Sequence, residues 1–169
     1  LEESEKARKL YPNDRAVEAT HAMLLGEKGQ TDAAAAILRA MLHGESGDRG
    51  TYLGLAQVFE RGKRFSDAEK AALKAAELAS QPAENEVVWF LMGAIQERQE
   101  KHDRAEEYFR KALELNPRNA AVLNYLGYML ADRGVRLDEA VSLIQVALDE
   151  EPANGAYLDS LGWAYYRQN

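Results

Sequence analysis

One stretch of the sequence, residues 86–119, restricts the fold of the 169-residue chain more than any other. In its first half, apolar and small residues follow one another at the three- and four-residue steps of an α-helix: Val88, Trp89, Met92, Gly93 and Ile95. A second run with the same spacing begins at Ala105 and ends before Pro117, which cannot continue a helix. Gly93, Ala105 and Ala112 carry too little bulk to hold two helix axes apart. The stretch therefore predicts a closely packed hairpin of two helices.

This hairpin resembles the tetratricopeptide repeat, a unit of about 34 residues with a defined order of Trp, Leu-Gly, aromatic, Ala and Pro positions. The resemblance rests on Trp89, Gly93, Ala105, Phe109, Ala112 and Pro117. Met92 stands where the family usually has Leu, and Gln96 stands where it usually has Tyr. The resemblance implies an all-α fold, a right-handed superhelical solenoid of antiparallel helix hairpins.

Weaker copies of the pattern run along the whole chain, which predicts a single repeat array. We expect residues 1–14 to end a preceding repeat, and residues 155–169 to form the first helix of a truncated one. Between them, the predicted repeats are residues 15–48, 49–85, 86–119 and 120–154. Four consecutive alanines at positions 33–36 leave the register of the first repeat open by one residue. Residues 124–128 and 157–163 are also similar to the closing repeats of long bacterial tetratricopeptide proteins, several of which are envelope-associated scaffolds.

The composition limits the kinds of partner and compartment. Acidic residues outnumber basic ones by 28 to 21, and the isoelectric point near 5.1 argues against nucleic acid and favours a basic or neutral protein partner. No apolar run approaches the roughly 18 residues that span a bilayer, so direct insertion into a membrane is not expected. The lack of Cys excludes disulfides and thiolate catalysis, but it leaves the compartment open between bacterial cytoplasm and cell envelope.

Nothing in the sequence has the pattern of a catalytic or metal site. His21, His43 and His102 fall in different predicted repeats and lack the spacing that places two imidazoles on one helix face. The glycine-rich residues 44–50 lack the preceding strand and the Gly-Lys-Ser/Thr end of a phosphate-binding loop, so we expect a turn there. We therefore expect no catalytic residue, no metal, no cofactor and no enzymatic activity.

The resemblance implies a surface for partners, because the first helices of successive hairpins line the inner, concave face in this family. By alignment, the residues on this face are Met23, Gln57, Val87, Phe90, Asn124, Tyr128, Asp159, Trp163 and Tyr166. Phe90, Tyr128 and Trp163 lie off the stripe that packs the hairpins, so they either stay exposed for a partner or fill the space between adjacent first helices. One subgroup of the family binds C-terminal carboxylates with Lys, Arg and Asn side chains, and here only Asn124 has that chemistry.

These patterns predict a scaffold that binds a peptide or helix of another protein on the concave face. Two alternatives stay open: a purely structural spacer or oligomerisation array, and a regulatory adaptor of a bound enzyme. The apolar residues of the two terminal helices, among them Leu10 and Leu158, also predict self-association through the truncated ends of the array.

Overall fold

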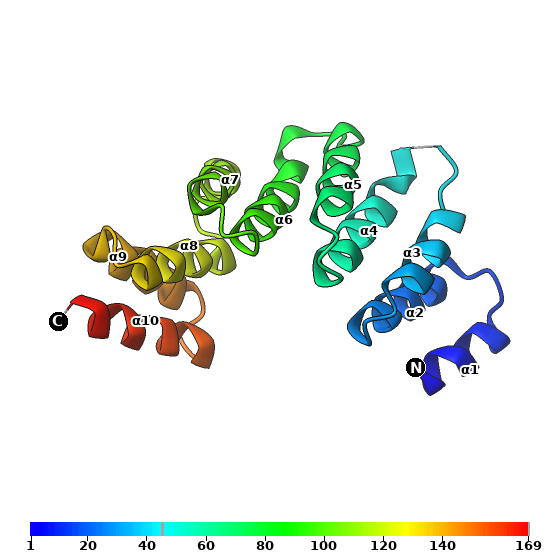
Figure 1. The fold of residues 1–169 in the computed structure, drawn as a ribbon, viewed down its shortest axis with the longest axis horizontal. Helices are drawn as coiled ribbons and strands as arrows, with labels where there is room; N and C mark the ends of the chain where they lie inside the picture. The colour runs from blue at the N-terminus through cyan, green and yellow to red at the C-terminus, as the bar shows by residue number, and fades with distance from the viewer. Residues whose placement is uncertain (45, 169) are drawn as a thin grey trace. The chain divides into compact units, whose positions relative to one another are not determined.

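The computed structural model describes residues 1–44 and 46–168, which form ten α-helices, two short 3₁₀ helices and no strand (Figure 1). The α-helices are α1 (Glu2–Leu10), α2 (Arg15–Glu27), α3 (Thr31–Ala40), α4 (Arg49–Arg61), α5 (Phe65–Glu77), α6 (Glu86–Glu97), α7 (His102–Leu115), α8 (Ala120–Arg133), α9 (Leu137–Glu150) and α10 (Gly155–Gln168). The 3₁₀ helices are η1 (Ser46–Asp48), which lies in the glycine-rich segment, and η2 (Pro82–Asn85). The prediction of an all-α fold is confirmed.

The chain divides into two compact units, Leu1–Ile95 and Gln96–Asn169, and the boundary lies within α6. Unit 1 contains α1 to α5 and most of α6, whereas unit 2 contains α7 to α10. Each unit contains several helices, so the division into two units does not mark the boundaries of single repeats. The repeat boundaries therefore stay a prediction.

The turn between the two helices of a hairpin contains the same backbone hydrogen bond in four places. An N–H donates to the carbonyl oxygen five residues earlier, as at many helix ends: Gln30 to Leu25 (2.9 Å), Arg64 to Phe59 (2.8 Å), Lys101 to Gln96 (3.0 Å) and Val135 to Leu130 (3.1 Å). The residue before each donor has a positive φ angle: Gly29, Lys63, Glu100 and Gly134. Glycine adopts this conformation without strain, and at Lys63 and Glu100 the turn imposes it on residues with side chains.

The core of unit 1 contains many alanines beside a few larger side chains. Helix α2 packs against α3, α4 packs against α5, and α4 also contacts α2 and α3. The buried apolar residues include Ala22, Leu25, Ala34, Leu38, Leu55, Ala56, Val58, Phe59, Ala68, Ala72 and Ala75. Glycine brings the helices closer still, because a Cβ at Gly26 would lie 3.1 Å from Val58 Cγ2. These small residues allow close packing but bury little apolar area each.

Unit 2 has larger buried side chains. Helix α8 packs against α9, and α10 packs against both. The large side chains that are almost completely buried include Phe109, Leu126, Leu130 and Ile144. A Cβ at Gly127 would lie 2.7 Å from Ile144 Cγ1 and 2.9 Å from the carbonyl oxygen of Ala140. Glycine at this position therefore lets α9 approach α8 despite the bulk of Ile144.

Ion pairs join neighbouring hairpins within each unit. In unit 1, Arg64 Nη1 lies 2.6 Å from Asp32 Oδ1. In unit 2, Arg133 Nη2 lies 3.2 Å from Asp103 Oδ1, and Arg136 contacts Glu106. Hydrogen bonding to Arg136 holds the pKa of the Glu106 carboxyl below its usual value, in opposition to desolvation. At least one partner of each pair is exposed to solvent, so we expect each pair to contribute little to the free energy of unfolding.

Candidate protein-interaction surfaces

Unit 1 has a groove of about 470 Å³ along α2 and α4. Met23 and Gln57, both predicted site residues, line this groove together with Arg15, Leu38, Met41 and Leu53. Gly54 keeps the groove open, because a Cβ there would lie 3.5 Å from Leu38 Cδ1 and 3.8 Å from Met23 Sδ. One cation, Arg15, lines the groove. Its Nη2 lies 3.6 Å from the buried carboxylate of Asp48. The apolar walls of the groove come from Met23, Leu38, Met41 and Leu53, and the two methionines can adapt their shape to a ligand.

Unit 2 has a pocket of about 410 Å³ between α8 and α10, here called the aromatic pocket. Its lining residues are Tyr128 of α8 and Leu158, Asp159, Gly162, Trp163 and Tyr166 of α10. The rings of Trp163 and Tyr166 stack with centroids 5.5 Å apart and planes inclined by 26°. The Arg167 guanidinium lies 5.5 Å from the Trp163 ring centroid and donates a hydrogen bond to the carbonyl oxygen of Asp132. Contact with Tyr166 and with Arg167 restricts the orientation of the Trp163 ring.

The aromatic pocket brings together four of the predicted site residues, and their exposure differs. Tyr166 is 71% exposed and Tyr128 is 44% exposed, whereas Trp163 is half-buried. The prediction did not include Leu158 and Gly162, which line the same pocket. Helical spacing could have identified both, because they lie four residues apart and on the same helix face as Asp159, Trp163 and Tyr166.

Asn124 lies one turn before Tyr128 on α8, but it is buried and lines neither the groove nor the pocket. Its amide oxygen Oδ1 has no hydrogen-bond partner among the described residues. The indole Nε1 of Trp163 has none either. Both atoms are covered in this structure, so a ligand would reach them only after the side chains that cover them move. Buried polar atoms without partners are costly, and a partner that hydrogen-bonds to them would recover part of that cost.

The two predicted site residues of α6 differ in exposure. Val87 is 38% exposed and Phe90 is half-buried, and neither lines the groove of unit 1 or the aromatic pocket. Of the apolar stripe predicted on this helix, Val88, Met92 and Ile95 are buried, whereas Trp89 is half-buried. The structure thus groups six of the nine predicted site residues into two surfaces, with Asn124, Val87 and Phe90 outside them.

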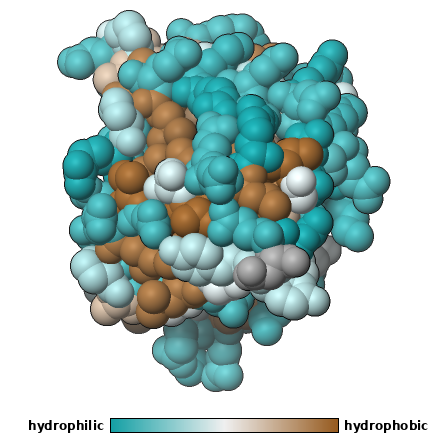
Figure 2. All heavy atoms as spheres, turned by 90° about the vertical axis from the view of Figure 1, so that its left-hand side faces the viewer, coloured by the Kyte–Doolittle hydropathy of each residue, from teal (hydrophilic) through white to brown (hydrophobic). Residues whose placement is uncertain are grey.

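The face of the molecule at α9 and α10 carries further apolar side chains. Figure 2 shows apolar atoms on this side, interrupted by hydrophilic residues. On α10, Leu158 is 53% exposed and Tyr165 is 42% exposed. The Tyr165 hydroxyl accepts a hydrogen bond from Gln145 Nε2 of α9 at 3.0 Å, which holds this ring against the second helix of its neighbour. Self-association through this face stays a prediction.

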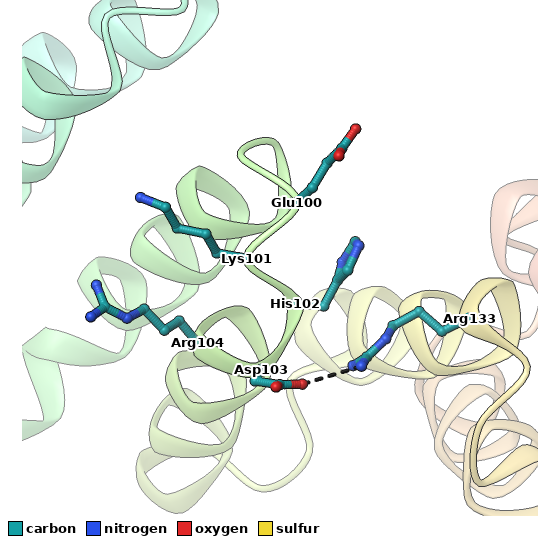
Figure 3. Close-up of a pocket in the computed structure, with 6 residues that line it drawn as sticks. All are labelled: Glu100, Lys101, His102, Asp103, Arg104 and Arg133. Atoms are coloured by element: carbon teal, nitrogen blue, oxygen red, sulfur yellow. Dashed lines mark hydrogen bonds and ion pairs between the residues drawn. The ribbon is translucent and has the colours of Figure 1, made fainter.

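A third pocket, of about 420 Å³, contains charged residues at the start of α7 and the end of α8. Figure 3 shows how its side chains lie: Asp103 and Arg133 meet, whereas Lys101 and Arg104 point away from this pair. His102 extends toward a different side from Lys101. The charged groups do not converge on one point where a substrate atom could sit, so the pocket lacks the geometry of a catalytic site.

One serine and one histidine meet in unit 1, a contact that sequence analysis missed. Ser4 Oγ lies 2.9 Å from His21 Nδ1, and both residues are buried. The hydroxyl donates to the carbonyl oxygen of Leu1 at 2.7 Å, which leaves the serine oxygen to accept the Nδ1 proton of His21. A histidine that donates to serine cannot act as the base that activates it. The pair therefore ties α1 to α2.

The described residues, 1–44 and 46–168, contain no group of three or more His, Asp or Glu side chains placed to hold a metal ion. In the same part of the chain, no helix combines the length and the apolar content needed to cross a membrane.

Comparison with known proteins identifies the repeat. Family models described as tetratricopeptide repeat match residues 20–84, 87–119 and 108–141. Among solved structures, the thermophilic TPR protein TTC0263 of Thermus thermophilus has 21% sequence identity and a TM-score of 0.78, with 96% of this chain and 87% of that chain covered. BtubC from P. vanneervenii has 21% identity and a TM-score of 0.72, with coverage of 98% and 80%. YrrB, described as a TPR protein with an unusual peptide-binding site, has 22% identity and a TM-score of 0.61, with coverage of 98% and 83%.

A search of curated protein sequences found no match. The similarity to the solved structures establishes the fold, which confirms the predicted solenoid of helix hairpins. The tetratricopeptide fold is a non-catalytic repeat scaffold that generally serves protein interactions. The three family models together cover most of the sequence, between residues 20 and 141. The chain therefore belongs to the tetratricopeptide repeat family.

Proposed function

We propose that this chain is a non-enzymatic scaffold that binds an extended segment of a partner protein on the surfaces of its first helices. The observation that carries the proposal is the aromatic pocket, in which Tyr128, Asp159, Trp163 and Tyr166 of two adjacent first helices line one depression. Exposed aromatic side chains gathered on one surface are typical of binding sites, because Trp and Tyr contribute much of the free energy of binding at protein interfaces.

The restricted orientation of Trp163 supports the proposal. Its ring is held by Tyr166 and Arg167, so little side-chain entropy remains to be lost when a partner packs against it. The groove of unit 1 adds a second surface, where Met23 and Met41 can adapt to an apolar side chain. An extended segment suits such surfaces, because its side chains can enter separate depressions along its length.

A peptide selection tests the proposal. Random peptides displayed on phage are selected on the immobilised chain, and synthetic versions of the enriched peptides are then titrated into it. We expect Tyr166→Ala and Tyr128→Ala each to weaken binding by about tenfold, as for an aromatic of intermediate importance at an interface. Circular dichroism should stay unchanged, because both side chains are substantially exposed.

The matched control is Leu73→Ala, which removes a side chain of similar exposure, 44%, from the second helix α5. We expect no change in affinity from this substitution. If Leu73→Ala weakens binding as much as Tyr128→Ala, the partner surface lies on the second helices. If no peptide is enriched, a purely structural spacer becomes the better interpretation.

A further inference from the structure

The aromatic pocket contains a carboxylate without a partner. Asp159 is exposed and is the charged residue among the six that line the pocket. No hydrogen bond or ion pair of its side chain occurs within residues 1–44 and 46–168. By contrast, Glu106, Glu139 and Glu150 of the same unit each pair with an arginine. Asp159 differs from these glutamates in lacking an arginine partner, and it lines the same pocket as the stacked rings of Trp163 and Tyr166.

Within the described residues, 1–44 and 46–168, no cation pairs with this carboxylate. From residue 137 to residue 166 the sequence has six acidic residues and no basic one. The nearest basic residue in sequence, Arg167, already donates to the carbonyl oxygen of Asp132 and lies against the Trp163 ring. The six residues that line the pocket thus carry one negative charge, that of Asp159, and this charge favours a positively charged group of a partner.

The rings of the pocket can receive such a group. Aromatic faces attract cations, and the same chain already places Arg64 4.7 Å and Arg39 5.4 Å from the Phe59 ring centroid. Asp159, Trp163 and Tyr166 follow one another at four and three residues along α10, so the carboxylate and both rings lie on one helix face. A cation against the exposed Tyr166 ring would therefore have a carboxylate on the same face.

We propose that the aromatic pocket binds an arginine side chain of the partner segment, stacked on Tyr166 and paired with Asp159. The proposal rests on the proposed function, since it names the chemistry of that partner. Arginine fits better than lysine because its planar guanidinium can stack on a ring while its N–H groups pair with a carboxylate. The remaining apolar wall, Leu158, suits the methylene stem of the same side chain.

Titration with two small probes tests the proposal. N-acetylarginine amide and N-acetylcitrulline amide have nearly the same shape, but only arginine is charged. Each is added to the ¹⁵N-labelled chain, and the dissociation constant is read from the shifts of the Trp163 indole and the α10 amides in NMR spectra. We expect arginine to bind about tenfold more tightly than citrulline, from the combined stacking and ion pairing of an exposed cation.

Two substitutions that each remove one negative charge test whether the preference for arginine depends on Asp159. Asp159→Asn should remove the preference for arginine, whereas Asp149→Asn, which removes an exposed carboxylate from α9, should leave it nearly unchanged. Equal binding of the two probes, or equal losses in the two variants, would overturn the proposal.

The result is separable from that of the peptide selection. Selected peptides that bind at the pocket without a basic residue, and that Asp159→Asn leaves unaffected, would contradict the arginine proposal while supporting the proposed function. Arginine bound at the pocket when no peptide is selected would support the arginine site and contradict binding of an extended segment.

Discussion

The two units use the same helix positions for different chemistry. The ninth residue of the first helix is Met23 in α2 and Gln57 in α4, but it is Tyr128 in α8 and Trp163 in α10. All four line a depression, those of unit 1 in an apolar groove and those of unit 2 in the aromatic pocket. The fold thus decides which positions line the depressions, and the residue placed there decides what they can bind.

The cores of the units differ in a complementary way. The eighth residues of the two helices in a hairpin are Ala56 and Ala72 in α4 and α5, and both are fully buried. In α8 and α9 the same positions hold Gly127 and Ile144. Where unit 1 has two small side chains, unit 2 has a glycine without a side chain opposite a large isoleucine. Close helix packing is therefore reached with different distributions of volume.

The largest expected effect comes from removing the large member of the unit 2 pair. Ile144→Ala should lower the free energy of unfolding by about 3 to 4 kcal/mol, because the fully buried side chain leaves a cavity opposite a glycine that cannot fill it. Urea denaturation followed by circular dichroism measures the change. A loss below about 1 kcal/mol would show that α8 and α9 collapse into the gap, and the comparison between the cores would fail.

Replacing two equivalent glycines by alanine should change the stability in opposite directions. Gly127→Ala should destabilise the chain by about 1 to 2 kcal/mol, because the new Cβ meets Ile144 and the backbone of α9. Gly162→Ala, at the same position of α10, has open space around its Cβ and should stabilise by up to about 1 kcal/mol through helix propensity. Thermal unfolding of both variants measures the difference. Shifts of the same sign would contradict the packing described at Gly127.

The double variant Gly127→Ala/Ile144→Ala recreates the alanine pair of unit 1. Its loss of stability should be smaller than the sum of the single losses by about 1 kcal/mol, since the contact with Ile144 no longer exists. Urea denaturation of the two single variants and the double variant measures this coupling. Strict additivity would mean that the carbonyl of Ala140 alone opposes a side chain at position 127.

Much of the fold was predictable from sequence because it depends on local patterns. The small residue at Gly127 and the helix-ending prolines recur at repeat spacing, and they predict hairpins without knowledge of neighbours. The placement of Asn124 was not predictable in this way. Alignment places it on the partner-facing side, but whether it is exposed depends on side chains that pack around it. The contact of Ser4 with His21 also joins residues without a recognisable spacing.

The candidate site was predictable in part. Alignment supplied Tyr128, Asp159, Trp163 and Tyr166, which the structure gathers into one pocket. Leu158 was assigned to an exposed terminal face, and its part in the pocket depends on how α10 packs against α8. That Asp159 lacks an ion-pair partner could not be predicted from its own position, because it depends on which carboxylates the arginines of unit 2 contact.

Helix capping offers a smaller test that compares the two units at equivalent places. Asp14 precedes α2 and accepts hydrogen bonds from Ala16 N (2.9 Å) and Val17 N (3.0 Å), while Asn119 precedes α8 and accepts one from Val122 N (3.0 Å). Asp14→Ala and Asn119→Ala should each cost about 1 kcal/mol in urea denaturation. Asp14→Asn, which keeps the acceptor, should cost less than Asp14→Ala. No difference between them would mean that the charge, and not the hydrogen bond, stabilises α2.

The smallest expected effect concerns acid. The pKa of Glu106 is held below its usual value of 4.5 mainly by Arg136, so its ionised form stabilises the folded state. That stabilisation is present above the usual pKa and is lost as the pH falls through the lowered one. Glu106→Gln should therefore reduce the melting temperature near neutral pH and make little difference once the pH lies well below the lowered pKa of Glu106. Glu107→Gln, which changes an exposed neighbour by the same charge, is the control. If the two variants lose the same stability near neutral pH, the ion pair between Glu106 and Arg136 has no measurable energetic role, and other contacts hold the hairpins of unit 2 together.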